Sequence, residues 1–513
     1  MFVSVRRALF LVLALLVTSA VFADERERDH GPGPDKERGF GANGQTPNGL
    51  PPEECLQFSC DSLPSSVTRD NVGQLAEAWR ITLPEIADGA PVYVAGISTD
   101  EGTRDLLIVS TFSGRVVAVN ARNGSIVWMT DPPDGQRWTT SSPAIDPSRE
   151  YVYAYGLDGF VHRYSIHDGS EVNGAGWPEL VTLKGDVEKG SSALSVVTTK
   201  SGKSYLYATI AAYPDPGDDG DYQGHVVTID LETGKQHVFN ALCSNMDVHF
   251  DASGLAGRDC DEVQAGIWAR AGVVYDPITD RTFVTTGNGT FDADQGGFNW
   301  GSSVVAIHPD GTTDGGTPLD SYTPTDYAFI TDEDLDLSST TVAILPIDST
   351  ENVGRLAVQG GKDERLRLLD LSDLSGQGGP RHIGGELQIV EIDTGGEVLS
   401  RPATWLAPDG TTWVFVTTDQ GINAYSLAIE NGVPSLVFRW SQEEPGTSPI
   451  VDSGILFYTE DENVRALDPE TGDELWSDDS IGHIHWESPI FVNDTLYLSD
   501  HQNELIAFRL PRQ

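Results

Sequence analysis

Asn463-Val-Arg-Ala-Leu-Asp-Pro-Glu-Thr-Gly-Asp-Glu-Leu-Trp476 begins with a short phrase that the chain uses eight times. Each copy alternates apolar with other residues and closes on a polar or charged one. The copies are 115–120, 160–165, 225–230, 303–308, 365–370, 421–426, 463–468 and 504–509. Successive copies start between 41 and 78 residues apart. A strand-like phrase recurring at about 40 residues or more predicts one four-stranded sheet per repeat, and hence an all-β, eight-bladed β-propeller.

The eighth copy is not followed by a further strand, whereas earlier copies continue through a turn into a strand that ends in an aromatic residue. Trp128 and Trp476 end two of these strands. The stretch Ala76-Glu-Ala-Trp79 is similar, so residues 75–82 are predicted to supply the missing strand. Such a strand would close the ring and remove a free sheet edge. A short helix is expected just before it, over 69–75, with Thr68 or Asp70 as its cap.

The first 23 residues have the pattern of a secretory signal peptide. Arg6 and Arg7 give a positive start, residues 8–16 are apolar, and Val21-Phe-Ala23 is a small-residue cleavage site. The apolar run is too short to span a membrane comfortably. We therefore expect a secreted or periplasmic protein without a membrane span, with a flexible polar leader over 24–62 and one propeller domain over 63–513.

Four cysteines are consistent with an oxidising compartment. In the local pairing, Cys55 bonds Cys60 in the leader and Cys243 bonds Cys260 in a long insertion. This pairing is one of three possible connectivities, and free buried thiols are the alternative. The chain has no Cys-x-x-Cys-His motif, so no covalent c-type haem is expected on it.

The formal net charge of -46 comes from 78 acidic and 32 basic residues. Such a surface repels nucleic acid and anionic lipid, so neither is an expected partner. The acidity is explained by solubility, by a saline environment, or by turns that bind cations. The sequence also lacks a phosphate-binding Walker loop, a dinucleotide fingerprint and a Gly-x-Ser-x-Gly nucleophile elbow, so nucleotide chemistry and serine hydrolysis are unsupported.

The segments 117–128 and 466–476 resemble the tryptophan-docking repeats of the pyrroloquinoline quinone (PQQ)-type eight-bladed propellers, and the likeness extends over about residues 65–510. That family contains dehydrogenases and non-catalytic scaffolds. The resemblance implies a PQQ- and calcium-dependent dehydrogenase that acts on an alcohol or similar small polar substrate and passes electrons to a separate acceptor. The alternative is a scaffold that binds protein or glycan partners at the cell envelope. A monomer is expected in either case.

The resemblance also implies site residues. The segment 274–289 is similar to the family's strand and turn that end in Thr-Gly-Asn, so Asn288 occupies the metal-binding position. Further along, Asp334 matches the catalytic base, and Asp336 is its neighbour in the metal site. A plain Asn-Gly turn and a solvated acidic loop are the alternative interpretations.

Three further positions complete the implied site. Lys362 matches a lysine that contacts the quinone oxygens, and Trp268 is the candidate ring on which the quinone stacks. Asp219 is the candidate acidic calcium ligand, with Asp221 as the second choice. Calcium prefers hard oxygen ligands of this kind.

The sequence His483-Ile-His485-Trp486 precedes one of three Ser-Pro pairs, which are expected to begin strands near the central channel. His485 and Trp486 would then face the funnel. The two histidines are spaced to share one side of a strand as metal ligands. A hydrogen-bonded structural role is the favoured interpretation, because the sequence shows no neighbouring ligand.

Overall fold

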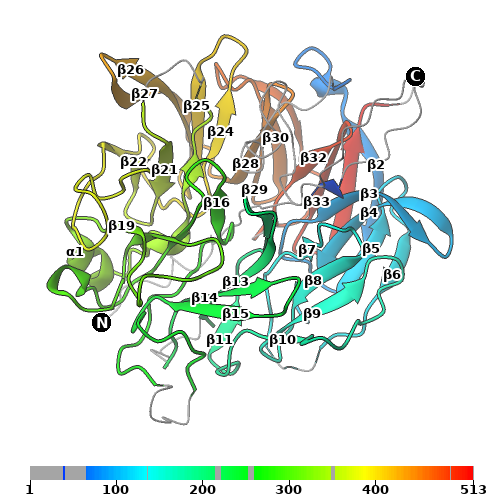
Figure 1. Ribbon diagram of the computed structural model, residues 1–513. Helices are drawn as coiled ribbons and strands as arrows, with labels where there is room; N and C mark the ends of the chain where they lie inside the picture. Colours follow the sequence, from blue (N-terminus) through cyan, green and yellow to red (C-terminus); the bar gives the residue numbers. More distant parts are fainter. Residues whose placement is uncertain are drawn as a thin grey trace, which may run out of the picture.

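Eight antiparallel sheets form the protein, and Figure 1 shows them set around a common centre in chain order. This computed structural model describes residues 39–40, 65–133, 135, 137–213, 221–251, 259–347, 353–485 and 487–511. The predicted all-β, eight-bladed propeller is confirmed.

The blades are described here in the order of their first strands. Blade 1 contains β3 (Val92–Thr99), β4 (Gly102–Ser110), β5 (Val116–Asn120) and β6 (Ile126–Met129), and blade 2 contains β7 (Ala144–Ile145), β8 (Tyr151–Tyr155), β9 (Phe160–Ser165) and β10 (Glu179–Leu180). Blade 3 contains β11 (Glu188–Gly190), β12 (Ser195–Thr198), β13 (Ser204–Ala212), β14 (His225–Asp230) and β15 (Gln236–Asn240). Blade 4 contains β16 (Val274–Asp276), β17 (Arg281–Thr285), β18 (Val304–Ile307) and β19 (Asp320–Tyr322). The short strand β1 (Gly39–Phe40) pairs with β3.

Blade 5 contains β20 (Ala343–Ile344), β21 (Leu356–Gly360), β22 (Arg365–Asp370) and β23 (Gln388–Glu391), and blade 6 contains β24 (Ala403–Leu406), β25 (Thr412–Thr417), β26 (Ile422–Glu430) and β27 (Val433–Gln442). Blade 7 contains β28 (Thr447–Asp452), β29 (Ile455–Glu460), β30 (Asn463–Leu467) and β31 (Glu474–Asp478). Blade 8 contains β32 (Ile490–Val492), β33 (Thr495–Ser499), β34 (Glu504–Arg509) and β2 (Ala76–Thr82). The described helices are α1 (Tyr327–Asp332) and the single 3-10 turns η2 (Val72–Gln74), η3 (Ala293–Gln295) and η4 (Leu337–Ser339).

The repeated phrase of the sequence is the third strand across every blade, from β5 in blade 1 to β34 in blade 8. In blade 3 this strand is β14, because β11 and β12 both pair with β13 and share the first position. The third strands lie inside the ring wall, with a neighbouring blade on each face. All five residues of β5 and all six of β14 are buried as a result. Burial on both faces explains why the phrase is rich in valine, leucine and isoleucine and alternates only in part.

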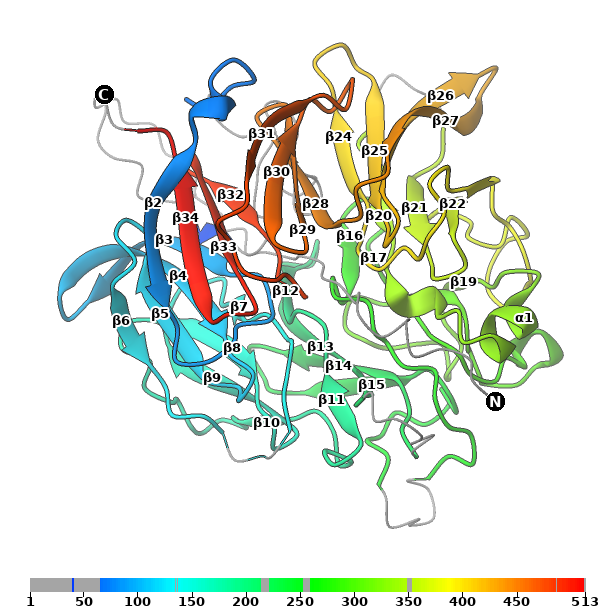
Figure 2. The ribbon, with the colours of Figure 1, turned by 180° about the vertical axis from the view of Figure 1, so that it is seen from behind.

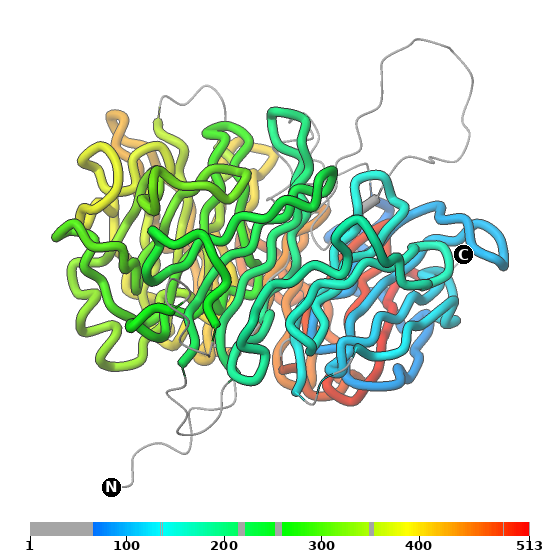
Figure 3. Tube along the Cα trace, turned by 60° about the horizontal axis from the view of Figure 1, so that its bottom comes forward, coloured from blue at the N-terminus to red at the C-terminus, as the bar shows by residue number. Residues whose placement is uncertain are grey.

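The ring closes through β2, which pairs with β34 from Ala76 opposite Arg509 to Thr82 opposite Glu504. Figures 2 and 3 show this N-terminal strand beside the C-terminal one. The predicted closing strand over 75–82 is therefore confirmed. The helix expected over 69–75 is wrong in extent: only η2 forms, and it has no side-chain cap. Instead, the Asn71 side chain accepts a hydrogen bond from the Thr68 amide at 2.7 Å.

Tryptophans at the outer strands join one blade to the next. Their indole N–H groups donate to backbone carbonyls of the following blade at 2.9 to 3.1 Å. The pairs are Trp79 with Ala121, Trp128 with Ile166, Trp440 with Pro469, and Trp476 with Leu75. A buried indole needs such an acceptor, so each pair seals a blade contact without leaving an unsatisfied donor.

Cys243 and Cys260 form a disulfide in the long segment that links blades 3 and 4, as the local pairing predicts. The other predicted pair, Cys55 with Cys60, lies outside the described residues, as do the predicted signal over 1–23 and all of the leader over 24–62 except Gly39 and Phe40. In the part of the chain that the structure describes, no helix has the length and apolar character that a membrane crossing requires.

Candidate functional site

The propeller carries its candidate site residues on the loops at one end of the ring. Neighbouring strands of a blade are antiparallel, so the loop entering the first strand and the loop after the second strand lie at the same end. The first strands of successive blades contact one another, as β24 and β28 do, and so surround the centre. Loops of these two kinds therefore form one mouth of the central channel.

Four predicted residues meet at this mouth, and we call them the Asn288 cluster: Asn288, Asp334, Asp336 and Lys362. The Asn288 side-chain amide donates to Asp334 Oδ1 at 2.8 Å, and its backbone amide donates to Asp336 Oδ1 at 3.4 Å. Lys362 Nζ lies 2.6 Å from Asp336 Oδ2. Three separate loops of blades 4 and 5 thus bring together residues that the sequence singled out individually.

Close backbone approach builds the Asn288 cluster. The Gly287 amide donates to the Gly266 carbonyl at 2.9 Å, and the Ser338 hydroxyl donates to the same carbonyl at 2.8 Å. A Cβ on Gly287 would lie 2.8 Å from both Asp336 Oδ1 and Ser338 Oγ. Only glycine therefore fits before Asn288, which gives a structural reason for the Thr-Gly-Asn sequence.

One buried side-chain oxygen of the Asn288 cluster has no hydrogen-bond donor among the described residues. Asn288 Oδ1 is buried and accepts no hydrogen bond from the described residues, and such an orphaned acceptor is costly unless a ligand satisfies it. Asp336 is also buried, whereas Asp334 is exposed at the end of its loop. An amide oxygen beside two carboxylates is a donor set that fits calcium.

Lys362 provides the positive charge of the cluster. Burial alone would lower the pKa of its ammonium group, but Asp336, and more weakly Asp334, raise that pKa above the ordinary lysine value. Lys362 therefore stays charged at neutral pH.

Trp268 lies beside the cluster's backbone. Its indole nitrogen would be 2.7 Å from a Cβ on Gly266, and its ring makes an edge contact with Tyr222 at 6.3 Å between centroids. The ring remains partly exposed at the mouth.

The predicted acidic ligand is not seen in the cluster. Asp219 lies outside the described residues. Asp221, the second choice, forms an ion pair with Lys184 at 2.9 Å, and the Lys184 side chain has no exposed surface. Asp221 therefore compensates a buried lysine in blade 3.

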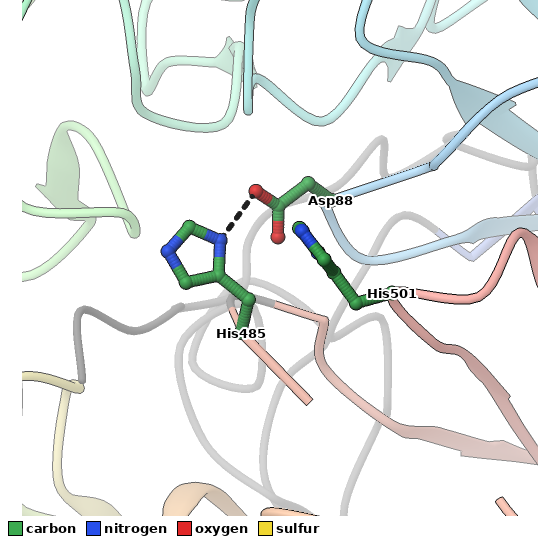
Figure 4. Close-up of side chains that lie close together, drawn as sticks. All are labelled: Asp88, His485 and His501. Atoms are coloured by element: carbon green, nitrogen blue, oxygen red, sulfur yellow. Dashed lines mark hydrogen bonds and ion pairs between the residues drawn. The ribbon is translucent and has the colours of Figure 1, made fainter. Parts of the chain in front are cut away.

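A second group of side chains lies at the seam between blades 8 and 1, and we call Asp88, His485 and His501 the seam cluster (Figure 4). His485 Nδ1 is 2.9 Å from Asp88 Oδ2. Glu487 supports both histidines: its carboxylate accepts from the His485 amide at 2.6 Å and contacts His501 Nδ1 at 3.2 Å.

The side chains of His483 and His485 take different carboxylate partners, in keeping with the hydrogen-bonded role expected for them. His483 contacts Asp461, and His485 contacts Asp88. Trp486 lies outside the described residues. Asp88 and His501 are remote from each other in the chain and carry no local motif, so the sequence does not single them out. One signal was available: His501 follows the second strand of its blade, as Asn288 and Lys362 do in theirs.

Burial is the largest cause of the pKa shifts of His485 and Glu487 in and beside the seam cluster. It lowers the pKa of His485 to about 3, helped by the charge of Arg270. Burial also raises the pKa of Glu487 to about 7, helped by the nearby Asp88 carboxylate. His485 is therefore a neutral imidazole at pH 7, with one ring nitrogen able to act as an acceptor or ligand.

The eight-bladed propeller and its repeats place the protein in the class of PQQ-like repeat propellers. The model of the glucose/ethanol/alcohol dehydrogenase β-propeller domain matches residues 62–312, and the model of outer membrane protein assembly factor BamB matches residues 384–511. Both models describe PQQ-type β-propeller repeats, so such repeats extend over residues 62–312 and 384–511. Compared with curated protein sequences, it gives no significant match.

Solved structures share the fold at low sequence identity. A quinohemoprotein alcohol dehydrogenase from Comamonas testosteroni aligns with a TM-score of 0.60 at 16% identity, covering 88% of this chain and 80% of the other. A quinohemoprotein alcohol dehydrogenase from Pseudomonas putida HK5 gives 0.58 at 16% identity, with the same coverage. A europium-containing methanol dehydrogenase gives 0.59 at 17% identity, covering 88% and 96%. These likenesses establish the fold.

Proposed function

We propose that the protein is an exported PQQ- and calcium-dependent dehydrogenase that oxidises an alcohol or a similar small polar substrate. The observation that carries this proposal is the convergence of Asn288, Asp334 and Lys362 from three loops at one channel mouth. A solvated acidic loop has no need of a buried, unsatisfied amide oxygen beside it.

The residues divide into ligands and positioning groups. Asn288 Oδ1 and the carboxylates of Asp334 and Asp336 would hold calcium, with Asp219 proposed as a further ligand. Trp268 would stack on the quinone, and Lys362 would contact its oxygens. Calcium with PQQ supplies a polarised quinone carbonyl that accepts the substrate's electrons.

Asp334 is the proposed general base. It is exposed at the mouth, so a substrate hydroxyl can reach it. The Asn288 amide donates to Asp334 Oδ1 and thereby orients the carboxylate. An oriented carboxylate within reach of the hydroxyl can take its proton as the alcohol is oxidised. Electrons would then pass to a separate acceptor, and the protein would act as a periplasmic or secreted monomer.

Reconstitution tests the proposal. The protein is incubated with PQQ and calcium, cofactor binding is followed by absorbance and calorimetry, and alcohol oxidation is followed with a redox dye. Asp334→Asn is expected to lower kcat by about 100-fold or more, in the range for loss of a general base, while PQQ still binds.

Asp332→Asn is the matched control, because Asp332 is an exposed carboxylate on the same segment. It should leave kcat unchanged. Failure of the unaltered protein to bind PQQ in the presence of calcium would rule out the dehydrogenase.

The second candidate is a non-catalytic scaffold that binds a protein or glycan partner at the cell envelope. The match of residues 384–511 to the BamB model favours it for blades 6 to 8. The same reconstitution distinguishes the two: a scaffold would bind neither PQQ nor calcium, and Asp334→Asn would then leave partner capture by the intact protein unaffected.

A further inference from the structure

The seam cluster gathers three potential metal ligands from three distant parts of the chain. One ligand atom from each of Asp88, His485 and His501 lies within 4.8 Å of the other two. Asp88 precedes β3, His485 precedes β32, and His501 lies between β33 and β34. Figure 4 shows the His485 ring and a ring nitrogen of His501 directed toward the Asp88 carboxylate. One ion could bind all three ligand atoms if it replaced the direct contact between His485 and Asp88.

Glu487 orients one of these ligands. Its Oε1 contacts His501 Nδ1 at 3.2 Å, and its Oε2 accepts from the His485 backbone amide at 2.6 Å. A carboxylate on one ring nitrogen fixes the histidine tautomer and leaves the other nitrogen to bind metal. The carboxylate–histidine contact that commonly supports metal sites is therefore already present.

Charge and access also fit an ion. The side chains of Asp88 and Glu487 have no exposed surface, so both carboxylates are shielded from water. The two carboxylates also interact electrostatically with each other. His485 and His501 keep 26% and 28% of their side-chain surface exposed, which gives an ion a path to the cluster. The buried Arg270 guanidinium interacts electrostatically with Asp88, and a divalent ion would add to that compensation of the Asp88 and Glu487 carboxylates.

We propose that Asp88, His485 and His501 bind a divalent transition-metal ion of the zinc and cobalt class. Imidazole nitrogen with one carboxylate suits these metals, whereas calcium prefers oxygen ligands alone. Its ligands come from blades 8 and 1 and include two imidazoles, whereas the Asn288 cluster comes from blades 4 and 5 and offers oxygen donors. Because its ligands come from the first and last blades, the ion would join the two sides of the ring's seam.

Cobalt binding tests this site directly, since Co²⁺ bound to imidazole absorbs in the visible range. The full chain is stripped with EDTA and titrated with Co²⁺, and Zn²⁺ binding is measured in parallel by calorimetry. One ion per chain is expected at the seam. His501→Gln should weaken binding at least 100-fold, and Glu487→Gln should weaken it about 10- to 100-fold, as for other supporting carboxylates.

Two controls separate this site from its surroundings. His483→Gln removes a neighbouring histidine whose partner is Asp461, and it should leave Co²⁺ binding unchanged. Asp334→Asn alters the Asn288 cluster and should likewise have no effect. His485→Asn provides a second ligand variant, and circular dichroism verifies that each variant is folded. Equal Co²⁺ affinity in folded His501→Gln or His485→Asn, or no binding by the unaltered protein, would overturn the proposal.

Discussion

His162 illustrates how single residues carry charge inside this acidic protein. It lies on β9, with Nδ1 2.7 Å from Glu171 Oε1 and Nε2 3.2 Å from the Asp158 carboxylate. Burial lowers its pKa, but the hydrogen bonds and charges of Asp158 and Glu171 outweigh burial and raise the pKa above the ordinary histidine value. The protonated imidazole is therefore favoured in the folded state.

This raised pKa predicts a pH-dependent contribution to stability. The contribution of His162 is fully present below the unfolded-state pKa of about 6.5 and is lost as pH rises through the higher folded-state pKa. Chemical unfolding of the unaltered protein and His162→Gln should show the largest difference in unfolding free energy near pH 5.5. That difference should shrink toward pH 8.5. Combined Asp158→Asn and Glu171→Gln should abolish the trend, and a constant difference across this range would contradict it.

At the scale of the element, the outer-strand tryptophans depend on glycines in the next blade. A Cβ on Gly124 would lie 2.7 Å from the Trp79 ring, and a Cβ on Gly169 would lie 2.5 Å from the Trp128 ring. Both glycines also adopt positive φ, at 76° and 73°. Each such turn glycine therefore serves two purposes, since it permits the turn and provides a flat platform for the neighbouring indole.

Gly124→Ala is predicted to destabilise the protein more than backbone strain alone explains. Gly202 is the matched control, because its φ is 79° and no described atom lies within 4 Å of its would-be Cβ. Gly202→Ala should cost about 1 kcal/mol for a side chain in the left-handed region. Gly124→Ala should cost about 1–3 kcal/mol more, because Trp79 must move. Thermal and urea unfolding measure both, and equal losses would show that the platform is unimportant.

The parts of the structure that could be predicted from the sequence are those that carry a local sequence motif. The third strands, the closing strand and the group Asn288, Asp334 and Lys362 each carry a recognisable stretch of sequence, and the structure brings that group together. Asp88 and His501 have no such stretch. Their approach depends on the register in which the first and last blades meet, which a tertiary contact decides. The helix expected before β2 is only the turn η2, because the backbone leaves the helical region at Leu75, with ψ of 136°, and passes directly into β2.

At the scale of the whole molecule, net charge opposes compactness. The chain has 78 acidic against 32 basic residues, which gives a formal charge of -46. Repulsion among so many like charges is spread over the entire surface and lowers the stability of the folded ring. Salt screens such repulsion, with a Debye length of about 10 Å at 0.1 M.

The thermal midpoint is therefore predicted to rise by several degrees, on the order of 5 °C, when sodium chloride increases from 0.05 to 0.5 M at pH 7.5. Differential scanning calorimetry measures this shift. The same titration at pH 5, closer to the sequence pI of about 4.3, should show a smaller rise because fewer charges repel. A midpoint that falls with salt at pH 7.5 would show that favourable ion pairs dominate instead.

Ring closure by β2 and β34 also sets an order of assembly during synthesis. The outer strand of blade 8 leaves the ribosome before every other blade strand from β3 onward, and its partner β34 leaves after all of them. A nascent chain must carry β2 as an open strand edge while seven blades form behind it. Any truncated product that stops before β34 retains that edge, so incomplete chains of this protein are natural candidates for aggregation or capture by chaperones.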